Sequence, residues 1–152
     1  MMKAFPEAKA GILERARGLS QGAARQWGKM TVHQMICHLN DSYLLGLGER
    51  KVADKSNMLT RNFVRVMALR APMQWPHGIK TMPEFDQVAG SGTLPAVFEM
   101  DKARLFFLIE RFTAEPRDFE FGRHPMFAEM SKWEWLRWGY LHADHHLRQF
   151  GL

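Results

Sequence analysis

The sequence predicts an all-α fold: a four-helix bundle with a long crossover loop and an extra short helix. Apolar residues recur at spacings of three and four along most of the chain, as they do on one face of an α-helix. Two pairs, Thr31 with Gln34 and Ser131 with Glu134, fit the capping box that starts a helix. No stretch shows the clear alternation of a β-strand. We therefore expect helices joined by loops.

Five helical segments follow from the apolar spacing and from the positions of Gly and Pro. The last of them starts at the Ser131 capping box and continues to the end of the sequence. The segment between Pro72 and Pro95 contains four prolines and three glycines, and a loop of this length in a small domain is often functional. The expected helices cover residues 5–19, 31–48, 59–71, 93–112 and 131 onward.

Length and composition indicate one globular domain over residues 1–152. The chain is 46% hydrophobic and 24% charged, close to globular averages. A single cysteine, Cys37, excludes an intramolecular disulfide and a zinc-finger site. We find neither a signal-peptide pattern nor an apolar stretch of about 20 residues, and so expect a cytoplasmic protein that does not cross a membrane.

The net charge of +5 is local. Seven basic and two acidic residues lie between Gly46 and Lys80, so this segment carries the whole excess. Arg61 and Arg65 are four residues apart and could form an anion-binding stripe with Arg70, but a solvated helix face is the simpler interpretation. Binding of anions or nucleic acid through this segment is therefore the weakest of the functional hypotheses.

The strongest chemical signal is the pair His142 and His146. Residues four apart on a helix are neighbours on one face, about 5–6 Å between Cβ atoms, so the pair can share a metal ion. On a helical wheel the pair lies beside the apolar arc, while Arg137 and Asp144 fall on the opposite, water-facing side. A zincin helix carries glutamate after its first histidine. Ala143 stands there, so that class is excluded.

A metal site needs at least one further ligand from another element. His38, in the middle of the second helix and on the shoulder of its apolar face, is the leading candidate. His33 is in the first turn of that helix and is expected to be exposed, while His77 and His124 are in loops that could approach. Three histidines leave positions open for water or substrate, as in catalytic zinc sites. The alternative is a pair of histidines joined by hydrogen bonds without a metal.

Three further polar residues lie near the predicted histidine site. Cys37 points about 100° away from His38 on the helix, so we expect it in the core and not on the same ion. Asp41 is expected near the solvent side. Gln149 continues the line of His142 and His146, where it could orient a ligand or satisfy a backbone group.

Four motifs, spread over nearly the whole chain in the order expected for the family, resemble the DinB/YfiT-like superfamily of metal-binding four-helix bundles. The branch that they resemble is bacterial and of unknown function. The most specific is His142-Ala-Asp-His-His146-Leu-Arg-Gln-Phe-Gly. The others are Met35-Ile-Cys-His38-Leu-Asn-Asp-Ser, Trp75-Pro-His-Gly78 and His124-Pro-Met-Phe127.

The resemblance implies a divalent metal held by His38, His142 and His146, and a homodimer. Relatives include thiol-dependent transferases, isomerases and proteins described as hydrolases, so the fold gives a metal site but no single reaction. Imidazole ligands suit zinc and nickel. We therefore expect a metal-dependent transferase or hydrolase acting on a small molecule, with no general base identified. The alternative is a non-catalytic binding or interaction module whose metal site is structural or degenerate.

Overall fold

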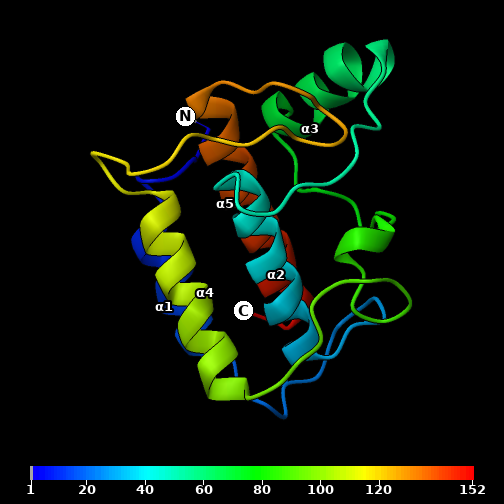
Figure 1. Ribbon diagram of the computed structural model, residues 1–152. Coiled ribbons are helices and arrows are strands. Elements are labelled where there is room, and N and C mark those ends of the chain that lie inside the picture. The colour runs from blue at the N-terminus through cyan, green and yellow to red at the C-terminus, as the bar shows by residue number, and fades with distance from the viewer. Residues whose placement is uncertain (1) are drawn as a thin grey trace.

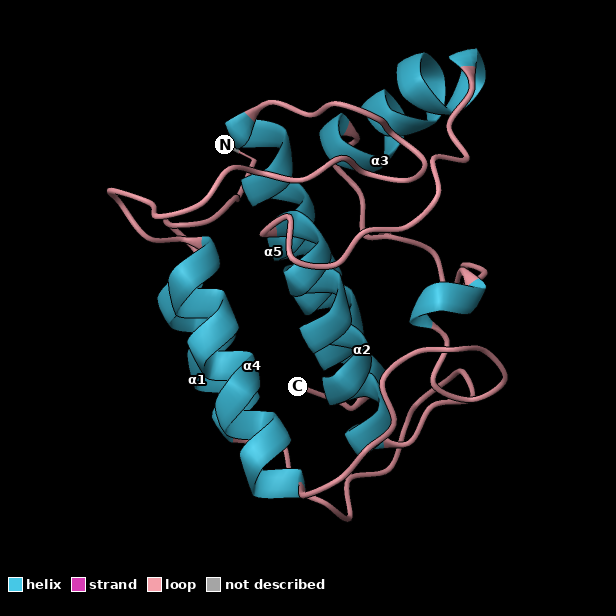
Figure 2. Cartoon of the chain, viewed as in Figure 1, coloured by secondary structure: helices cyan, strands magenta, loops and turns pink. Residues whose placement is uncertain are grey.

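The computed structural model describes residues 2–152, and these residues form helices and loops without a β-strand (Figure 2). A π-helical turn at Thr60–Val64 leads directly into α3, and a 3-10 turn lies at Pro83–Phe85. The prediction of an all-α chain with five helical segments is confirmed for the described residues. The α-helices are α1 (Lys9–Arg17), α2 (Val32–Gly46), α3 (Arg65–Arg70), α4 (Phe98–Phe112) and α5 (Lys132–Gln149).

Both predicted capping boxes are present. The Thr31 hydroxyl oxygen accepts a hydrogen bond from the backbone N–H of Gln34 at the start of α2, and the Gln34 side-chain oxygen accepts one from the backbone N–H of Thr31. Ser131 and Glu134 make the same pair of bonds at the start of α5. These two capping boxes are thus local signals that determine where α2 and α5 begin.

Helices α2 and α5 lie side by side near the centre of the molecule, with α4 against α2 and α1 against α5 (Figure 1). An ion pair between Lys9 and Glu110, 2.7 Å long, joins α1 to α4. A shared core of buried apolar side chains, including Trp135 and Tyr43, fills the space among the four helices.

Two glycines let an aromatic ring approach the central helices closely. A Cβ added at Gly46 of α2 would lie 2.5 Å from the ring of Phe112, and one at Gly139 of α5 would lie 2.7 Å from it. The Tyr43 hydroxyl also donates to the Gly139 carbonyl oxygen at 2.9 Å. These contacts hold α2 and α5 in a fixed relation, and the histidines of interest project from these two helices.

The prediction that Arg137 and Asp144 face water was wrong for Arg137 and only partly right for Asp144. Arg137 is 5% exposed; its Nε donates to the Leu69 carbonyl oxygen at 3.0 Å, and its Nη1 donates to the Lys3 carbonyl oxygen. Asp144 is half-buried and pairs with Arg15 at 2.7 Å. The reason is that α1, α3 and the N-terminal segment cover this side of α5, which a wheel of one helix cannot anticipate.

Residues 58–70 form one continuous helical stretch, hereafter the 58–70 helix, that touches the rest of the molecule along a narrow strip. Thr60 and Leu69 are its buried residues. Most of its surface is exposed, including five large apolar side chains: Met58 (81%), Leu59 (62%), Phe63 (63%), Val66 (44%) and Met67 (48%). Such a concentration of exposed apolar area marks an interaction surface more often than chance exposure.

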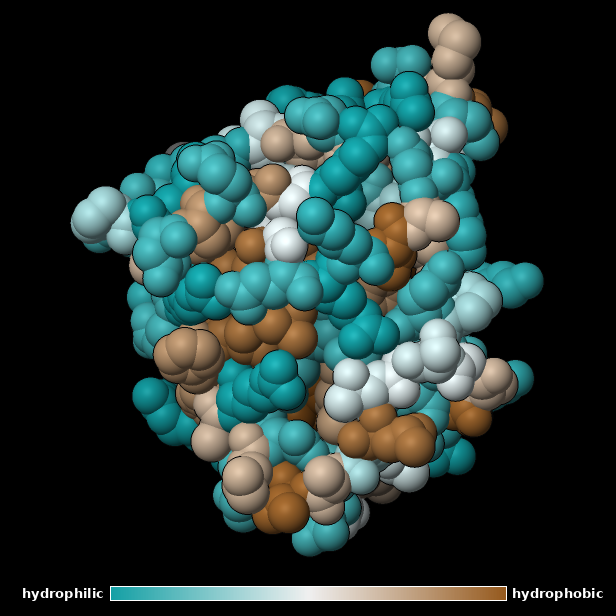
Figure 3. Space-filling view, in the orientation of Figure 1, coloured by the Kyte–Doolittle hydropathy of each residue, from teal (hydrophilic) through white to brown (hydrophobic). Residues whose placement is uncertain are grey.

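Elsewhere, hydrophilic residues dominate the face seen in Figure 3, and apolar residues gather there in separate patches. Among the residues described, no helix combines the length and apolar character needed to cross a membrane.

Candidate metal centre

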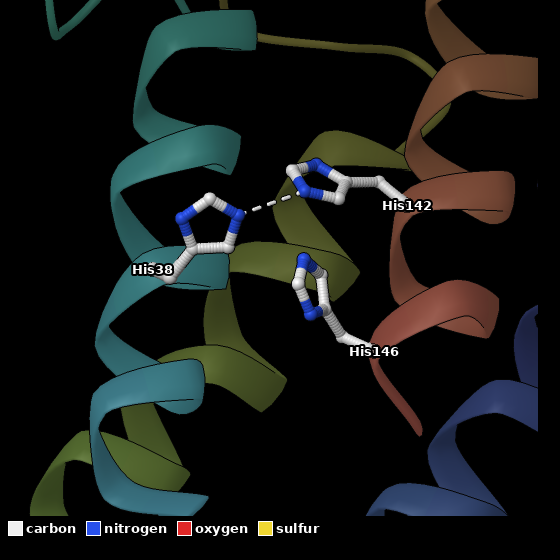
Figure 4. Close-up of side chains that lie close together, drawn as sticks. All are labelled: His38, His142 and His146. Atoms are coloured by element: carbon white, nitrogen blue, oxygen red, sulfur yellow. Dashed lines mark hydrogen bonds between the residues drawn. The ribbon is translucent and has the colours of Figure 1, made fainter. Parts of the chain in front are cut away.

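Three histidines converge between the two central helices. His38 projects from α2, and His142 and His146 project from successive turns of α5 toward it (Figure 4). One ring nitrogen of each lies within 4.8 Å of the others, and the Nε2 atoms of His38 and His142 are 2.9 Å apart. The structure thus brings together the three residues singled out in the sequence.

The outer nitrogens of two of these rings are held by hydrogen bonds. His38 Nδ1 lies 2.8 Å from the Phe85 carbonyl oxygen, and His146 Nδ1 lies 2.8 Å from Gln149 Oε1. Gln149 Nε2 donates to the Trp27 carbonyl oxygen at 3.0 Å, which fixes the orientation of the amide. Because both partners of the imidazoles are acceptors, Nδ1 carries the proton in each ring and the lone pair of Nε2 faces the centre.

The geometry and donor set fit a divalent cation. Two imidazole nitrogens at the usual 2.0–2.1 Å from a tetrahedral zinc ion lie about 3.3 Å apart. The 2.9 Å between His38 and His142 therefore needs only a small widening. His142 Nδ1 is buried and has no hydrogen-bond partner among residues 2–152, so this ring is the least constrained of the three.

Electrostatics favour the neutral, metal-binding form of all three rings. Burial lowers the pKa of His38, and it holds the pKa of His142 and His146 well below the usual range. Mutual repulsion among protonated histidines would lower the pKa of His142 further, since His146 and His38 are its nearest titratable neighbours. Protons therefore do not compete for these nitrogens at neutral pH, and the three imidazoles can hold a metal ion.

The family described as "Protein of unknown function (DUF1569)" matches residues 4–151. The chain belongs to the DUF1569 family. No curated protein and no solved structure matches this chain.

In this DUF1569 protein, Asp41 is not on the solvent side as expected; it is 1% exposed. Its carboxylate accepts from Gln87 Nε2 at 2.8 Å, from Thr93 N at 2.8 Å and Oγ1 at 2.6 Å, and from Arg50 Nη1 at 3.1 Å. The wheel failed here because the loop after α3 folds back over this face of α2. Asp41 is thereby the anchor of residues 83–93.

The anchored loop contains the partner of His38. Arg50 bridges Asp41 and the Glu84 carbonyl oxygen, which its Nη2 reaches at 2.7 Å. Phe85 follows directly and accepts from His38. Asp41 is therefore linked to His38 through three intermediate residues, Arg50, Glu84 and Phe85.

Gln149 and Trp27 complete the support of His146. Of the two roles considered for Gln149, the structure shows both: its oxygen orients His146, and its NH2 satisfies the Trp27 carbonyl. The Trp27 ring stacks on His77 at 3.7 Å between centroids, so the 20–30 and 72–95 loops meet above α5. No sequence motif connected Trp27 with the site.

The remaining candidates lie apart from the three-histidine centre. Cys37 is buried in the core, as expected, and its burial and the nearby Asp101 raise its pKa to about 12. His33 is half-buried, not exposed, because it pairs with Asp101 at 2.7 Å. His124 is buried, and burial lowers its pKa to about 3. Its Nδ1 accepts from the backbone N–H groups of residues 126 and 127, which makes it a structural residue.

Proposed function

We propose that this protein binds one divalent metal ion, zinc or nickel, at His38, His142 and His146, and uses it in a transferase or hydrolase reaction on a small molecule. The observation that carries the proposal is the convergence of three neutral imidazoles from two helices, two of them with their outer nitrogens held. When bound, the metal supplies a Lewis acid that polarises a substrate or lowers the pKa of a bound water or thiol.

The chain's own residues contribute positioning. Phe85 and Gln149 hold His38 and His146 in the tautomer that offers Nε2 to the centre. Hydrogen bonds of this kind raise the basicity of the ligand and fix the ring plane. Trp75 and Trp138 flank His142, with ring centroids at 5.9 and 4.8 Å, and would exclude water from that side of the site.

The same observations support a DinB/YfiT-like assignment. Four long helices surround one core, and a long connection runs from α3 to α4. The three histidines lie on α2 and α5, in the positions that the resemblance implies. We therefore propose a four-helix bundle of that type.

Metal content of protein purified without a histidine tag tests the proposal. After incubation with zinc or nickel and desalting, we expect His146→Ala to hold one equivalent less than His77→Ala. The control removes an exposed histidine that lies outside the centre. Helical content measured by circular dichroism should match between the two variants. Equal metal content in the two variants would overturn the proposal.

A structural metal is the second candidate, because His38 and His146 are 5% and 7% exposed. Cobalt can replace the native ion and report its surroundings. A site with an open position changes its visible cobalt spectrum when azide or a small thiol is added, whereas a closed structural site does not. An unchanged spectrum would favour the structural role over the catalytic one.

The expected homodimer is also a proposal, with the exposed face of the 58–70 helix as its interface. Five large apolar side chains lie exposed along this one helix, with Met58 at 81%, Leu59 at 62% and Phe63 at 63%, and a standard interface buries about 800 Å² per partner. The basic residues of this helix do not oppose self-association. Arg61 pairs with Asp54, Arg65 with Glu134, and Arg70 lies over the Trp133 ring.

A charge placed on that face tests the dimer. Phe63→Glu should shift the mass measured by light scattering at about 100 µM to that of a monomer, because a carboxylate would be buried at the interface. Phe107→Glu is the matched control, since Phe107 is equally exposed (62%) on α4. A monomeric wild-type protein, or identical masses for both variants, would contradict the proposal.

A further inference from the structure

A second group of metal-ligand residues lies between α2 and α4. His33 and Cys37 are four residues apart on α2, and Asp101 faces them from the first turn of α4. One donor atom from each lies within 4.8 Å of the others. His33 Nε2 is 2.7 Å from Asp101 Oδ2. These are nitrogen, sulfur and oxygen donors on two helices that pack against each other.

We propose that His33, Cys37 and Asp101 form a second cation site, distinct from the three-histidine centre, for a zinc-like ion that accepts a thiolate ligand. Zinc combines these donors at about 2.0–2.3 Å, which places ligand atoms roughly 3.3–3.7 Å from one another. The donor atoms lie within 4.8 Å of one another, so an ion would draw the more distant ones about 1 Å closer. When the ion binds, the Cys37 thiol releases its proton to solvent, and the resulting thiolate donates a lone pair to the ion.

Two of the three proposed ligands, Asp101 and His33, also contact residues outside the second site. The Asp101 carboxylate accepts from Ala96 N at 3.1 Å, and the Asp101 carbonyl oxygen accepts from Asn40 Nδ2 at 3.0 Å. The His33 ring meets the Phe98 ring edge-to-face at 5.3 Å. The Asn40–Asp101 and His33–Phe98 contacts join α2 to α4 beside the proposed ligands, and they do not depend on the bond between His33 and Asp101.

Asn40 adds an independent observation. It follows Cys37 by three residues and His33 by seven, so the three share one stripe of α2. Asn40 is 4% exposed, yet its Oδ1 has no hydrogen-bond partner within residues 2–152. A buried amide oxygen without a partner is costly, and a cation or its bound water would satisfy it.

Access and charge are compatible with loading from solvent. The side chains of His33 and Asp101 are 15% and 18% exposed, while Cys37 lies beneath them at 1%. The nearby positive charge of Arg104 opposes a cation, and the Asp101 carboxylate, whose pKa is lowered by its bonds to His33 and Ala96, offsets it.

Cobalt titration of reduced, untagged protein tests the proposal, because a thiolate bound to cobalt gives a near-ultraviolet charge-transfer band that imidazole ligands do not. The chain has one cysteine, so any such band belongs to Cys37. We expect the band in wild type and in His146→Ala, and its loss in Cys37→Ser. His33→Ala and Asp101→Asn should raise the cobalt concentration at half-saturation of the band by about tenfold or more.

Each outcome decides between alternatives. Absence of the band in wild type would overturn the second site and leave the three-histidine proposal intact. A band lost in His146→Ala would assign Cys37 to the other centre. If His33→Ala and Asp101→Asn leave the band unchanged, Cys37 binds cobalt without these two residues. Both of the last two outcomes overturn the proposed site.

Discussion

Replacing Asp41 with Asn tests how far the loop anchor supports both the fold and the site. Asparagine keeps one acceptor oxygen, but its NH2 group would face donors from Gln87, Thr93 and Arg50. Two hydrogen bonds to a buried charged acceptor are then lost, each worth about 1.5–3 kcal/mol. Because Asp41 is 1% exposed, water does not replace them. We expect the free energy of unfolding to fall by about 3 kcal/mol.

The same substitution should weaken zinc binding. Loss of the anchor loosens residues 83–93 and with them the Phe85 carbonyl that orients His38. Loss of such an outer hydrogen bond typically reduces metal affinity 10–100-fold. Competition with a chromophoric chelator, at a temperature where the variant is folded, measures the affinity. Urea unfolding measures the stability.

Asp118→Asn is the matched control, since it makes the same change on a carboxylate that is 72% exposed, and its stability should stay within about 0.5 kcal/mol of wild type. If Asp41→Asn loses stability but binds zinc as wild type does, Asp41 does not position His38. If its stability is unchanged, the hydrogen-bond network contributes little, and the reasoning is wrong from its first step.

Two further predictions use other supports of the structure. Gly28→Ala should lower zinc affinity and destabilise the fold by about 1–2 kcal/mol, because Gly28 has φ +82° and its new Cβ would overlap the Gln149 amide that holds His146. Gly22→Ala, in the same loop with open space around it, should be neutral in both calorimetry and chelator competition; equal effects would refute the steric argument. Burial lowers the pKa of His124 from 6.5 in the unfolded chain to about 3 in the fold. The unfolded chain therefore takes up a proton first, so the free energy of unfolding is highest above pH 6.5 and falls by up to roughly 5 kcal/mol as the pH drops toward 3. His124→Asn should therefore reduce the slope of the unfolding free energy against pH between pH 6.5 and 4.5, by up to about 1.4 kcal/mol per pH unit, which corresponds to one proton. Parallel pH curves for wild type and variant would contradict this.

Local signals in the sequence were reliable predictors. The capping boxes at Thr31 and Ser131 depend on residues three apart, and both are formed. The alignment of His142 with His146 is likewise a property of one helix. Because these features need no knowledge of the tertiary fold, periodicity and spacing suffice to find them.

Features that depend on distant segments were missed or misread. Asp41 and Arg137 are polar positions on faces that other segments cover, so a wheel assigned both to solvent. The supports of the site come from the Phe85 carbonyl and, through Gln149, from Trp27, and main-chain carbonyls carry no sequence signature. The π-helical turn at Thr60–Val64 was also unforeseen, since the apolar spacing is nearly the same with or without it.

The separation of the ligands along the chain bears on how the protein is made. His38 precedes His142 by 104 positions, and a chain emerges from the ribosome with its N-terminal part first. While α5 is still being synthesised, α2 offers one imidazole and the other two do not yet exist. Any ion that the three imidazoles hold together is therefore captured only after α5 has been made and has docked against α2. Metal loading would then report on completed folding, and nascent chains would not compete with finished proteins for scarce metal.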